Sequence, residues 1–339
     1  MRKIIINKSY TSNRSKPINY TPNDDYLFSH EYSKDIKKSF YKKKRSVYIK
    51  NLDLYKYKYF LSYYEHTKMK KYPLNLAIKN TLKNYIHSKP ASDIEVTDKG
   101  TWGLDEKSFH YFHWFCDTLT RYIQVSKFNK EYPFLINSFL IKKDYIYETL
   151  NMLNINYKIY ESDKLYKIKD LLISSHVADS GNFSYKNINE LSTKLKEANA
   201  SSEVKDPELK IWISRNKSKH RKILNEDKLI PILNNSNFKI IYPEDLSFKD
   251  QIEIYKNTSV MGGLHGGALT NMLFMNKNTK LIELRRNGDS ENNCYFTLAS
   301  ELKIKYYYLE CKSLHQDLYI SDIEVDLDKF ENLINETND

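Results

Sequence analysis

Short apolar runs alternate regularly with amphipathic segments in the second half of the chain. The apolar runs predict strands over residues 209–215, 238–243, 258–263, 279–285 and 303–310. Helical spacing between them predicts helices over 221–235, 247–257, 266–275 and 291–302. Strands that alternate with helices through short connections are typical of a parallel sheet covered on both faces. We therefore expect an α/β domain here.

The first half is less regular. The opening "MRKIIINKSY" predicts a first strand, residues 8–50 a polar, exposed segment with some helix, and residues 51–90 a loosely helical region. Phe112, Phe115, Leu119 and Tyr122 recur at steps of three and four, which predicts a buried helix. Further strands are predicted over 133–141 and 155–161, and another strand leads to a turn around Gly181.

A polar stretch without periodicity, residues 194–207, predicts a linker. We therefore expect two domains and a tail, with a last helix over 327–335 that packs back across the domains. The expected bounds are an N-terminal domain 1–195, a linker 196–207, a C-terminal domain 208–325 and a tail 326–339.

Charge is unevenly distributed along the 339 residues, whose net charge is +11. Residues 1–100 contain 22 basic and 9 acidic side chains, whereas the remainder is close to neutral. This asymmetry fits an anionic membrane surface, a nucleic acid or another polyanion, and equally a solvated lysine-rich surface. The 3 cysteines show neither a disulfide nor a zinc pattern. With no signal peptide or apolar span in the sequence, we expect a cytoplasmic protein, either free or held peripherally on the inner face of the membrane.

Four of the 8 glycines fall within residues 262–267, around His265. The stretch "SVMGGLHGGALTNMLF" is a predicted strand, turn and helix. Ligands of parallel α/β sheets bind beyond the carboxyl ends of the strands, where glycine permits close approach and positive φ. The start of the following helix favours an anion. A tight turn alone would explain two of the four glycines.

Cationic and acidic side chains also lie at the ends of two other predicted strands. The loop "SRNKSKHR" brings Arg215, Lys217, Lys219, His220 and Arg221 beyond the first strand, and arginine forks suit phosphate oxygens. On a later strand, Glu283 is placed either to accept from sugar hydroxyls or to pair with Arg285 or Arg286.

Four sequence blocks, in order, resemble glycosyltransferase family 61, which includes bacterial capsular-polysaccharide enzymes. They are "YFHWFCDTLTRY", "WISRNKSKHRKILNE", "YPEDLSFKDQIEIY" and "GGLHGGALTNMLFM" followed by "LIEL". The resemblance covers residues 102–122 and 211–284 and departs at Gly267, where alanine is usual, and at Thr120, where proline is common.

This resemblance implies a GT-B architecture, with two Rossmann-like domains of parallel sheets facing a cleft. It also implies an inverting, metal-independent transfer in bacterial surface-polysaccharide synthesis. No cofactor is expected; the donor would be a nucleotide-sugar, with a UDP-sugar favoured, and the acceptor a glycan or lipid-linked glycan. No nucleic acid partner is expected. The single D-x-D, Asp326 to Asp328, is interpreted as acidic residues at a helix start.

Inverting transfer requires a base for the acceptor hydroxyl and positive charge for the departing diphosphate. We favour Asp117 as the base and keep His113, one turn earlier, as the alternative. A purely structural role, in which the two side chains bond each other or cap a neighbour, is the other interpretation. Trp114 and Trp212 are expected in the core. His265 is expected either to bond the donor or to orient its own turn, and Asn271 to bond locally. The donor-binding set is Arg215, Lys219, Arg221, Gly263, His265, Gly266, Gly267, Asn271 and Glu283.

The competing hypothesis is a nucleic-acid- or polyanion-binding protein without catalysis, which would explain the basic first third. It would not require glycines and arginines at the strand ends.

Overall fold

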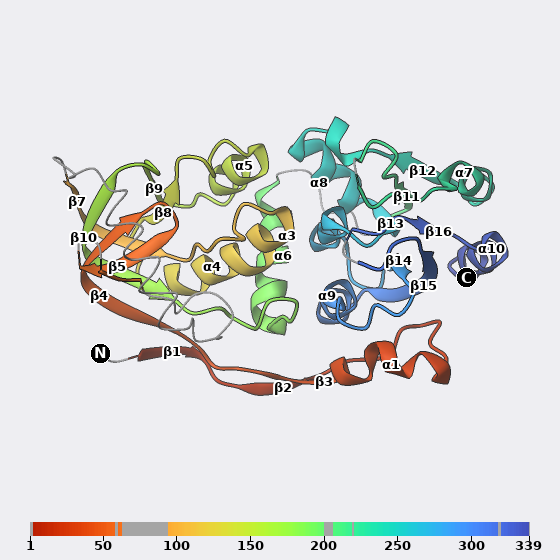
Figure 1. The fold of residues 1–339 in the computed structure, drawn as a ribbon, viewed down its shortest axis with the longest axis horizontal. Helices are drawn as coiled ribbons and strands as arrows, with labels where there is room; N and C mark the ends of the chain where they lie inside the picture. The colour runs from red at the N-terminus through yellow and green to blue at the C-terminus, as the bar shows by residue number, and fades with distance from the viewer. Residues whose placement is uncertain are drawn as a thin grey trace. The chain divides into compact units, whose positions relative to one another are not determined.

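The computed structural model describes residues 3–57, 60–62, 94–199, 206–218, 220–317 and 320–338. The contacts divide the chain into two compact units (Figure 1). Unit 1 contains Met1–Tyr10 and Ile36–Ser180, and unit 2 contains Thr11–Asp35 and Gly181–Asp339. The chain therefore passes from unit 1 into unit 2, back into unit 1, and finally into unit 2.

Unit 1 is built on a mixed sheet in the order β6-β5-β4-β10-β7-β8-β9, with β1 also paired to β4. The pairs β10–β7, β7–β8 and β8–β9 are parallel, whereas β4 pairs antiparallel with β1, β5 and β10. The strands are β1 (Lys3–Asn7), β4 (Ser39–Lys50), β5 (Asp53–Tyr57), β6 (Phe60–Ser62), β7 (Ile94–Trp102), β8 (Phe134–Asn137), β9 (Tyr157–Tyr160) and β10 (Leu165–Ser174).

One continuous helical segment packs on this sheet. It consists of α3 (Tyr111–His113), the π-helical η3 (Trp114–Leu119) and α4 (Thr120–Ser126), and α4 contacts β7 and β10. The helix predicted from the spacing of Phe112, Phe115, Leu119 and Tyr122 is confirmed. Phe115, Leu119 and Tyr122 are buried, whereas Phe112 is half-buried. A further helix, α5 (Asp144–Met152), lies between β8 and β9 in the chain.

Three predictions for the first half are wrong. Residues 39–50, expected in an exposed segment with some helix, form β4 inside the sheet, where Lys42 is buried. The predicted helical region 51–90 contains strands β5 and β6; its remaining part, 58–59 and 63–90, lies outside the described residues. The parallel Rossmann-like sheet expected for the N-terminal domain is instead mixed.

Unit 2 contains the predicted parallel sheet, in the order β12-β11-β13-β14-β15, with β16 antiparallel at one edge. β11 is the first strand of this sheet along the chain, and in the sheet it lies between β12 and β13. The next strand, β12, is added on one side of β11 and all later strands on the other side, so the strand order reverses at β11. The strands are β11 (Leu209–Ile213), β12 (Phe238–Ile241), β13 (Thr258–Leu264), β14 (Lys280–Arg286), β15 (Lys305–Ser313) and β16 (Ile323–Glu324).

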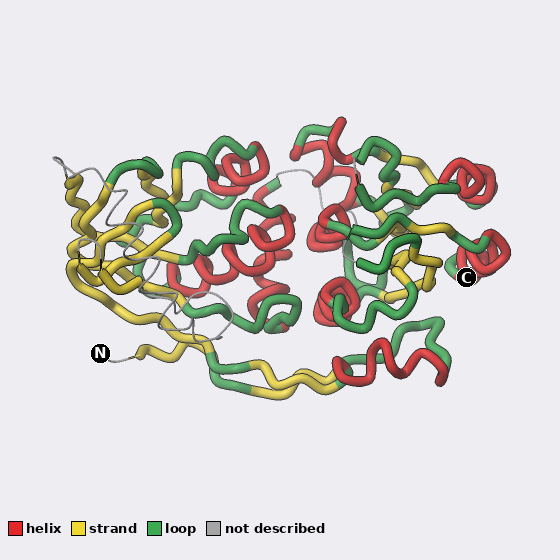
Figure 2. The backbone as a smooth tube through the Cα atoms, viewed as in Figure 1, coloured by secondary structure: helices red, strands yellow, loops and turns green. Residues whose placement is uncertain are grey.

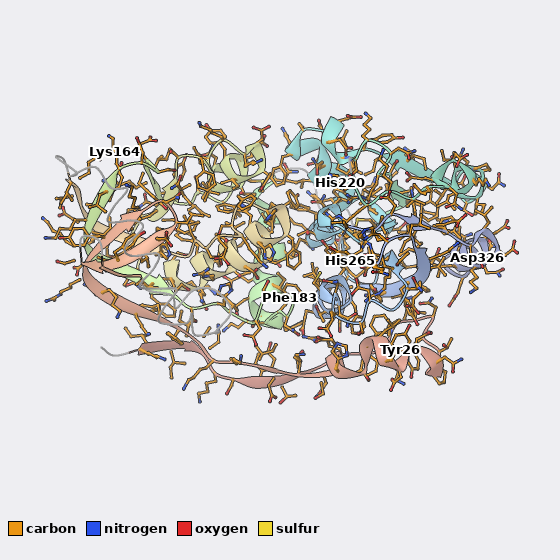
Figure 3. The ribbon with its side chains drawn as sticks, viewed as in Figure 1. Tyr26, Lys164, Phe183, His220, His265 and Asp326 are labelled. Carbon is orange, nitrogen blue, oxygen red and sulfur yellow. The ribbon has the colours of Figure 1, made fainter. Side chains whose placement is uncertain are left out.

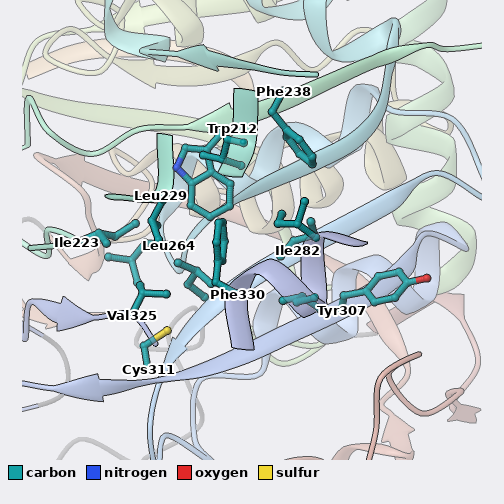
Figure 4. Close-up of a cluster of buried hydrophobic side chains, with 14 of the residues drawn as sticks. Trp212, Ile223, Leu229, Phe238, Leu264, Ile282, Tyr307, Cys311, Val325 and Phe330 are labelled. Carbon is teal, nitrogen blue, oxygen red and sulfur yellow. The ribbon is translucent and has the colours of Figure 1, made fainter. Parts of the chain in front are cut away.

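Helices cover both faces of this sheet (Figures 1 and 2). On one face α7 packs against α10, and on the other α8, α9 and α6 pack against η5. Trp212, Leu264 and Phe330 belong to the core beneath α7 and α10 (Figure 4). The helices are α6 (Tyr185–Ala198), α7 (Glu226–Asn235), η4 (Pro243–Asp245), α8 (Phe248–Lys256), η5 (Gly267–Phe274), α9 (Cys294–Leu302) and α10 (Leu327–Glu336).

Two helices of unit 2 begin with a side-chain cap, and the second of these caps confirms the interpretation of Asp326 as an acidic residue at a helix start. Ser247 caps α8 by accepting from the backbone N–H of Asp250, and Asp326 caps α10 by accepting from that of Lys329. Helix α7 begins at Glu226, later than predicted. The prediction that the last helix packs across the domains is wrong, because α10 is buried in the core of unit 2 itself.

The observed units differ from the predicted domain bounds at two places. Helix α6 belongs to unit 2, so the division falls at Ser180 rather than at the expected linker, part of which (200–205) lies outside the described residues. Residues 11–35, here called the arm, also belong to unit 2. The arm contains η1 (Pro22–Asp24), α1 (Asp25–Phe28) and η2 (Ser29–Glu31), flanked by the paired strands β2 (Tyr10–Asn13) and β3 (Ser33–Ile36).

Gly262 on β13 is required by a close approach rather than by a turn. A Cβ at this position would lie 2.7 Å from ring carbons of Trp212. We expect Gly262→Ala to lower the free energy of unfolding by about 1–3 kcal/mol, because a fully buried indole must be displaced. Chemical denaturation followed by tryptophan fluorescence measures this change.

Gly267→Ala is the matched control, because no heavy atom lies within 4 Å of its added Cβ. An equal loss of stability in both variants would contradict the packing role of Gly262.

Candidate active site

The predicted strand ends of unit 2 lie together in the sheet. β11 and β13 are neighbours at the point where the strand order reverses, and β14 is the next strand along. In sheets of this order, ligands bind beyond the carboxyl ends at this reversal. Arg215 follows β11, His265 follows β13, and Arg286 ends β14.

Arg215 is held firmly against the glycine turn. Its Nε donates to the carbonyl of Arg221 at 2.8 Å, and its Nη2 donates to Ser218 Oγ at 3.0 Å and to the His220 carbonyl at 3.2 Å. A Cβ on Gly266 would lie 2.5 Å from Arg215 Nη1. Glycine at residue 266 thus leaves room for the Arg215 guanidinium, which lies on its backbone.

The expected positive φ is absent from all four clustered glycines. Gly266 has a φ of 173°, which is extended backbone. Gly263 packs against Ile213, and Gly267 begins η5 in open space, which explains how the family's alanine fits there. The helix expected after the turn is the 3-10 helix η5.

Three arginines gather positive charge at this edge. Burial, followed by the charges of Arg221 and Arg286, lowers the pKa of Arg215 to about 10. Burial and Arg221 likewise lower the pKa of Arg286. Within the described part of the chain, neither Arg215 nor Arg286 forms an ion pair, and Nη2 of the buried Arg286 has no hydrogen-bond partner. Guanidinium groups without a directly bonded carboxylate are suited to a phosphate anion.

His265 is held by a buried carboxylate. Its Nδ1 bonds Glu283 Oε1, and its ring packs edge-on against Tyr295 at 4.8 Å. A carboxylate only accepts, so Nδ1 carries a proton and donates. Among the described residues no hydrogen bond reaches Nε2, and His265 retains a partly exposed side chain (Figure 3).

Glu283 is fully buried, and its second oxygen accepts from the Tyr306 hydroxyl at 2.6 Å. Burial opposes ionisation, but His265 and Arg285 outweigh it and lower the pKa of Glu283. Arg285 lies 3.8 Å from the carboxylate, as one interpretation of the sequence expected. The other interpretation, a contact with sugar hydroxyls, does not fit a carboxylate with no exposed surface. Glu283 therefore holds His265.

The remaining predicted donor residues are placed as follows. Asn271 is buried in η5 and donates to Gln251 on α8 at 3.4 Å, so it bonds a neighbouring helix. Lys219 lies outside the described residues.

Trp114 and Trp212 are fully buried core residues, as expected.

Unit 1 brings His113 and Asp117 together. His113 Nδ1 and Asp117 Oδ2 are 2.7 Å apart, and Ser180 Oγ donates to the same oxygen at 2.9 Å. Asp117 lies in the π-helical η3 and is 6% exposed, whereas the His113 side chain is 19% exposed. π-Helical turns are frequent at functional sites. The accessible partner of this pair is therefore the imidazole.

Sequence reasoning missed Ser180, Arg286 and Tyr306. Ser180 follows β10 in a turn before Gly181, and Arg286 directly follows the predicted strand at 279–285, so strand-end position was an available signal for both. Tyr306 gave no such signal, because it is one of three consecutive tyrosines in β15.

Arg121 of the first sequence block has a structural role. It is fully buried and donates to Asp105 at 3.0 Å, and His176 lies 3.3 Å from the same carboxylate. Burial opposes ionisation of Asp105, but His176 and Arg121 hold its pKa well below the usual range. This network joins α4 to the loops that follow β7 and β10.

A parallel sheet with arginine side chains gathered at the carboxyl ends of its strands is typical of enzymes that hold phosphorylated ligands. Residues 111–282, slightly more than half of the chain, match the family model described as Glycosyltransferase 61. The chain belongs to glycosyltransferase family 61, a class of transferase enzymes.

Curated relatives share shorter segments. The EGF domain-specific O-linked N-acetylglucosamine transferase of Drosophila melanogaster is 34% identical over 116 residues, 32% of this chain and 22% of that protein. The protein of the same name from Mus musculus is 34% identical over 107 residues, 30% of this chain and 20% of that protein. The matched segments thus span about a fifth of each relative. These relatives are animal proteins and lend no support to the expected bacterial capsular context.

Two further observations concern the described residues alone. They include no group of His, Cys, Asp and Glu side chains arranged to hold a metal ion. Their helices are all too short or too polar to span a membrane.

The contact between Arg215 and Gly266 gives a sharp test. We expect Gly266→Ala to keep near-normal stability, because Arg215 can swing away, but to weaken binding of inorganic pyrophosphate roughly tenfold, since about one charged hydrogen bond is lost. Titration calorimetry measures the affinity. Gly267→Ala, one residue on, should bind as the parent does; equal weakening in both would refute the positioning of Arg215 by Gly266.

The lowered pKa of Glu283 predicts a pH dependence. The unfolded carboxyl binds more protons than the folded one near its ordinary pKa of 4.5, so its stabilisation exists above that pH and is lost as pH falls. Glu283→Gln should therefore be less stable than the parent at neutral pH, with the difference shrinking in acid. Urea denaturation from neutral to acidic pH measures this, with the exposed Glu331→Gln on α10 as control. A difference that is constant across pH would contradict an ionised Glu283.

Proposed function

We propose that the protein is an inverting, metal-independent glycosyltransferase that moves a sugar from a nucleotide-sugar to a hydroxyl of a glycan acceptor. The observation that carries this proposal is the arginine cluster at the β11–β13 strand reversal. Arg215 is fixed there without a carboxylate partner in the described chain, next to Arg221 and Arg286. Family membership supplies the reaction class.

The donor diphosphate is proposed to lie against Arg215 and the His265 turn. Negative charge develops on the diphosphate as the sugar leaves, and fixed guanidinium groups stabilise that charge without reorganising. His265, whose Nδ1 is held by Glu283, directs Nε2 outward as a further hydrogen-bonding group. No step in this scheme requires a metal ion.

The acceptor hydroxyl is proposed to lose its proton to the His113–Asp117 pair. Asp117 accepts from His113 and from Ser180, so it is engaged and buried. Its bond to Nδ1 leaves Nε2 of His113 as the basic nitrogen, as in other His–carboxylate pairs. We therefore reverse the roles expected from the sequence, with His113 as the base and Asp117 as its positioning residue.

Donor binding by unit 2 and removal of the acceptor proton by unit 1 must take place on the same pair of substrates. The proposal therefore includes the GT-B arrangement, in which the two units face a common cleft. The names of the curated relatives make UDP-N-acetylglucosamine the first donor to test. The basic strands of unit 1 remain a proposed contact for an anionic membrane that carries the acceptor.

A thermal-shift screen with UDP-, GDP-, CMP- and TDP-sugars in excess EDTA tests the donor site. One donor class should raise the melting temperature by mass action, and Arg215→Ala should abolish the rise. Lys217→Ala is the matched control, because this exposed cation in the same loop pairs with Asp245. Then, with the donor identified, His113→Ala and Asp117→Asn should lower sugar transfer by about 100-fold or more while sparing the melting shift.

No shift with any donor would overturn the proposal, as would full transfer by His113→Ala. Tight, strongly salt-dependent binding of polynucleotides in its place would favour the nucleic-acid hypothesis.

A further inference from the structure

The arm, residues 11–35, covers an edge of the unit 2 sheet. β15 pairs with β14 on one side. On its other side the N–H of Ile18 donates to the Tyr306 carbonyl at 2.9 Å. The side chain of Asn19 bonds both backbone groups of Tyr308, donating at 2.7 Å and accepting at 3.2 Å. The arm thus satisfies backbone groups that an uncovered strand edge would leave open.

A buried arginine fastens the arm to α9. Arg14 is 7% exposed and bonds Glu31 within the arm and Glu301 on α9, each at 3.2 Å. Its Nη2 also donates to Asn182 at 2.9 Å, and Ser12 donates to Glu301 at 2.6 Å. Because removing one partner of such a network leaves a buried charge uncompensated, this attachment is specific and costly to break.

The Phe28 side chain of the arm is buried in the interior of unit 2. It is fully buried between Phe296 and Tyr308, with ring centroids 4.9 and 4.8 Å away. The guanidinium carbon of Arg285 lies 5.0 Å from the Phe28 ring centroid, which is cation–π geometry. One face of Arg285 is therefore in contact with the arm.

A second contact reaches Arg285 through Asn293. The Asn293 side chain donates to the Leu27 carbonyl at 2.7 Å and accepts from Arg285 Nη2 at 2.8 Å. Both Leu27 and Asn293 are buried. The arm thus contacts Arg285 directly through the Phe28 ring and indirectly through the side-chain amide of Asn293.

Arg285 is connected to His265 through the side chains of Tyr306 and Glu283. Its Nη1 donates to the Tyr306 hydroxyl at 3.2 Å, and that hydroxyl donates to Glu283 at 2.6 Å. Glu283 in turn bonds His265 Nδ1. Every member between the arm and His265 is buried, so little water competes for these bonds.

We propose that the arm is a positioning element of the His265 site, with Phe28 as its positioning residue. Phe28 sets Arg285, Arg285 and Tyr306 set Glu283, and Glu283 sets the orientation of the His265 ring. The effect on anion binding rests on the proposed function, whereas the effect on His265 does not.

The experiment uses the full chain labelled with ¹⁵N-histidine. A proton shared with a buried carboxylate exchanges slowly, so His265 Nδ1–H should give a downfield resonance, assigned by its loss in His265→Gln. Phe28→Ala should shift or abolish this resonance and weaken inorganic pyrophosphate binding roughly tenfold. Tyr26→Phe is the control on the same arm, because Tyr26 is 52% exposed and bonds Glu310 outside the network (Figure 3).

A folded Phe28→Ala whose resonance is unchanged overturns the proposal. If that variant does not fold, Phe28→Leu replaces it; leucine keeps most of the apolar volume but lacks the ring face, and an unchanged resonance again overturns the proposal. If pyrophosphate does not bind the parent protein while the resonance still depends on Phe28, the proposed function fails and the positioning role stands.

Discussion

The negative charge of a carboxylate inside a protein must be balanced by hydrogen-bond donors and positive charges around it. In unit 2, Glu283 is a buried carboxylate that requires such partners. It has no exposed surface and lies on a central strand. Its compensation requires His265 on one oxygen, Tyr306 on the other, and Arg285 nearby. Those partners in turn need Asn293 and the arm. The orientation of His265 thus depends on one buried charge.

The arginines of unit 2 divide into two kinds. Arg285 has a phenol, an amide, a carbonyl and an aromatic face around it, so its charge is used within the fold. Arg215 is equally fixed, but by carbonyls and a hydroxyl, which orient a guanidinium without neutralising it. Orientation without neutralisation is what an anion site requires. The contrast between Arg215 and Arg285 separates the ligand-facing cation from the structural one.

The sequence predicted the second half well and the first half poorly for an identifiable reason. In unit 2 apolar runs, glycines and caps agree with one another, so the strand ends that bear Arg215 and His265 could be placed in advance. In β4 the run of lysines hides the period of two, because Lys42 lies buried with its ammonium 5.5 Å from the centroid of the Phe40 ring. The pairing of His113 with Asp117 followed from helical spacing, whereas Ser180 reaches them only through tertiary structure.

The arm shows why domain bounds read along the chain were insufficient. Residues 11–35 are separated from the rest of unit 2 by all of unit 1 except its first strand, and no local pattern marks them as part of a distant sheet. The family match runs from residue 111 to residue 282, so the arm precedes it and Glu283 and Tyr306 follow it. The match therefore includes the His265 turn but not the residues that orient its imidazole. Because an imidazole that is free to rotate offers no fixed hydrogen bond, the residues outside the match are as necessary to this site as those within it.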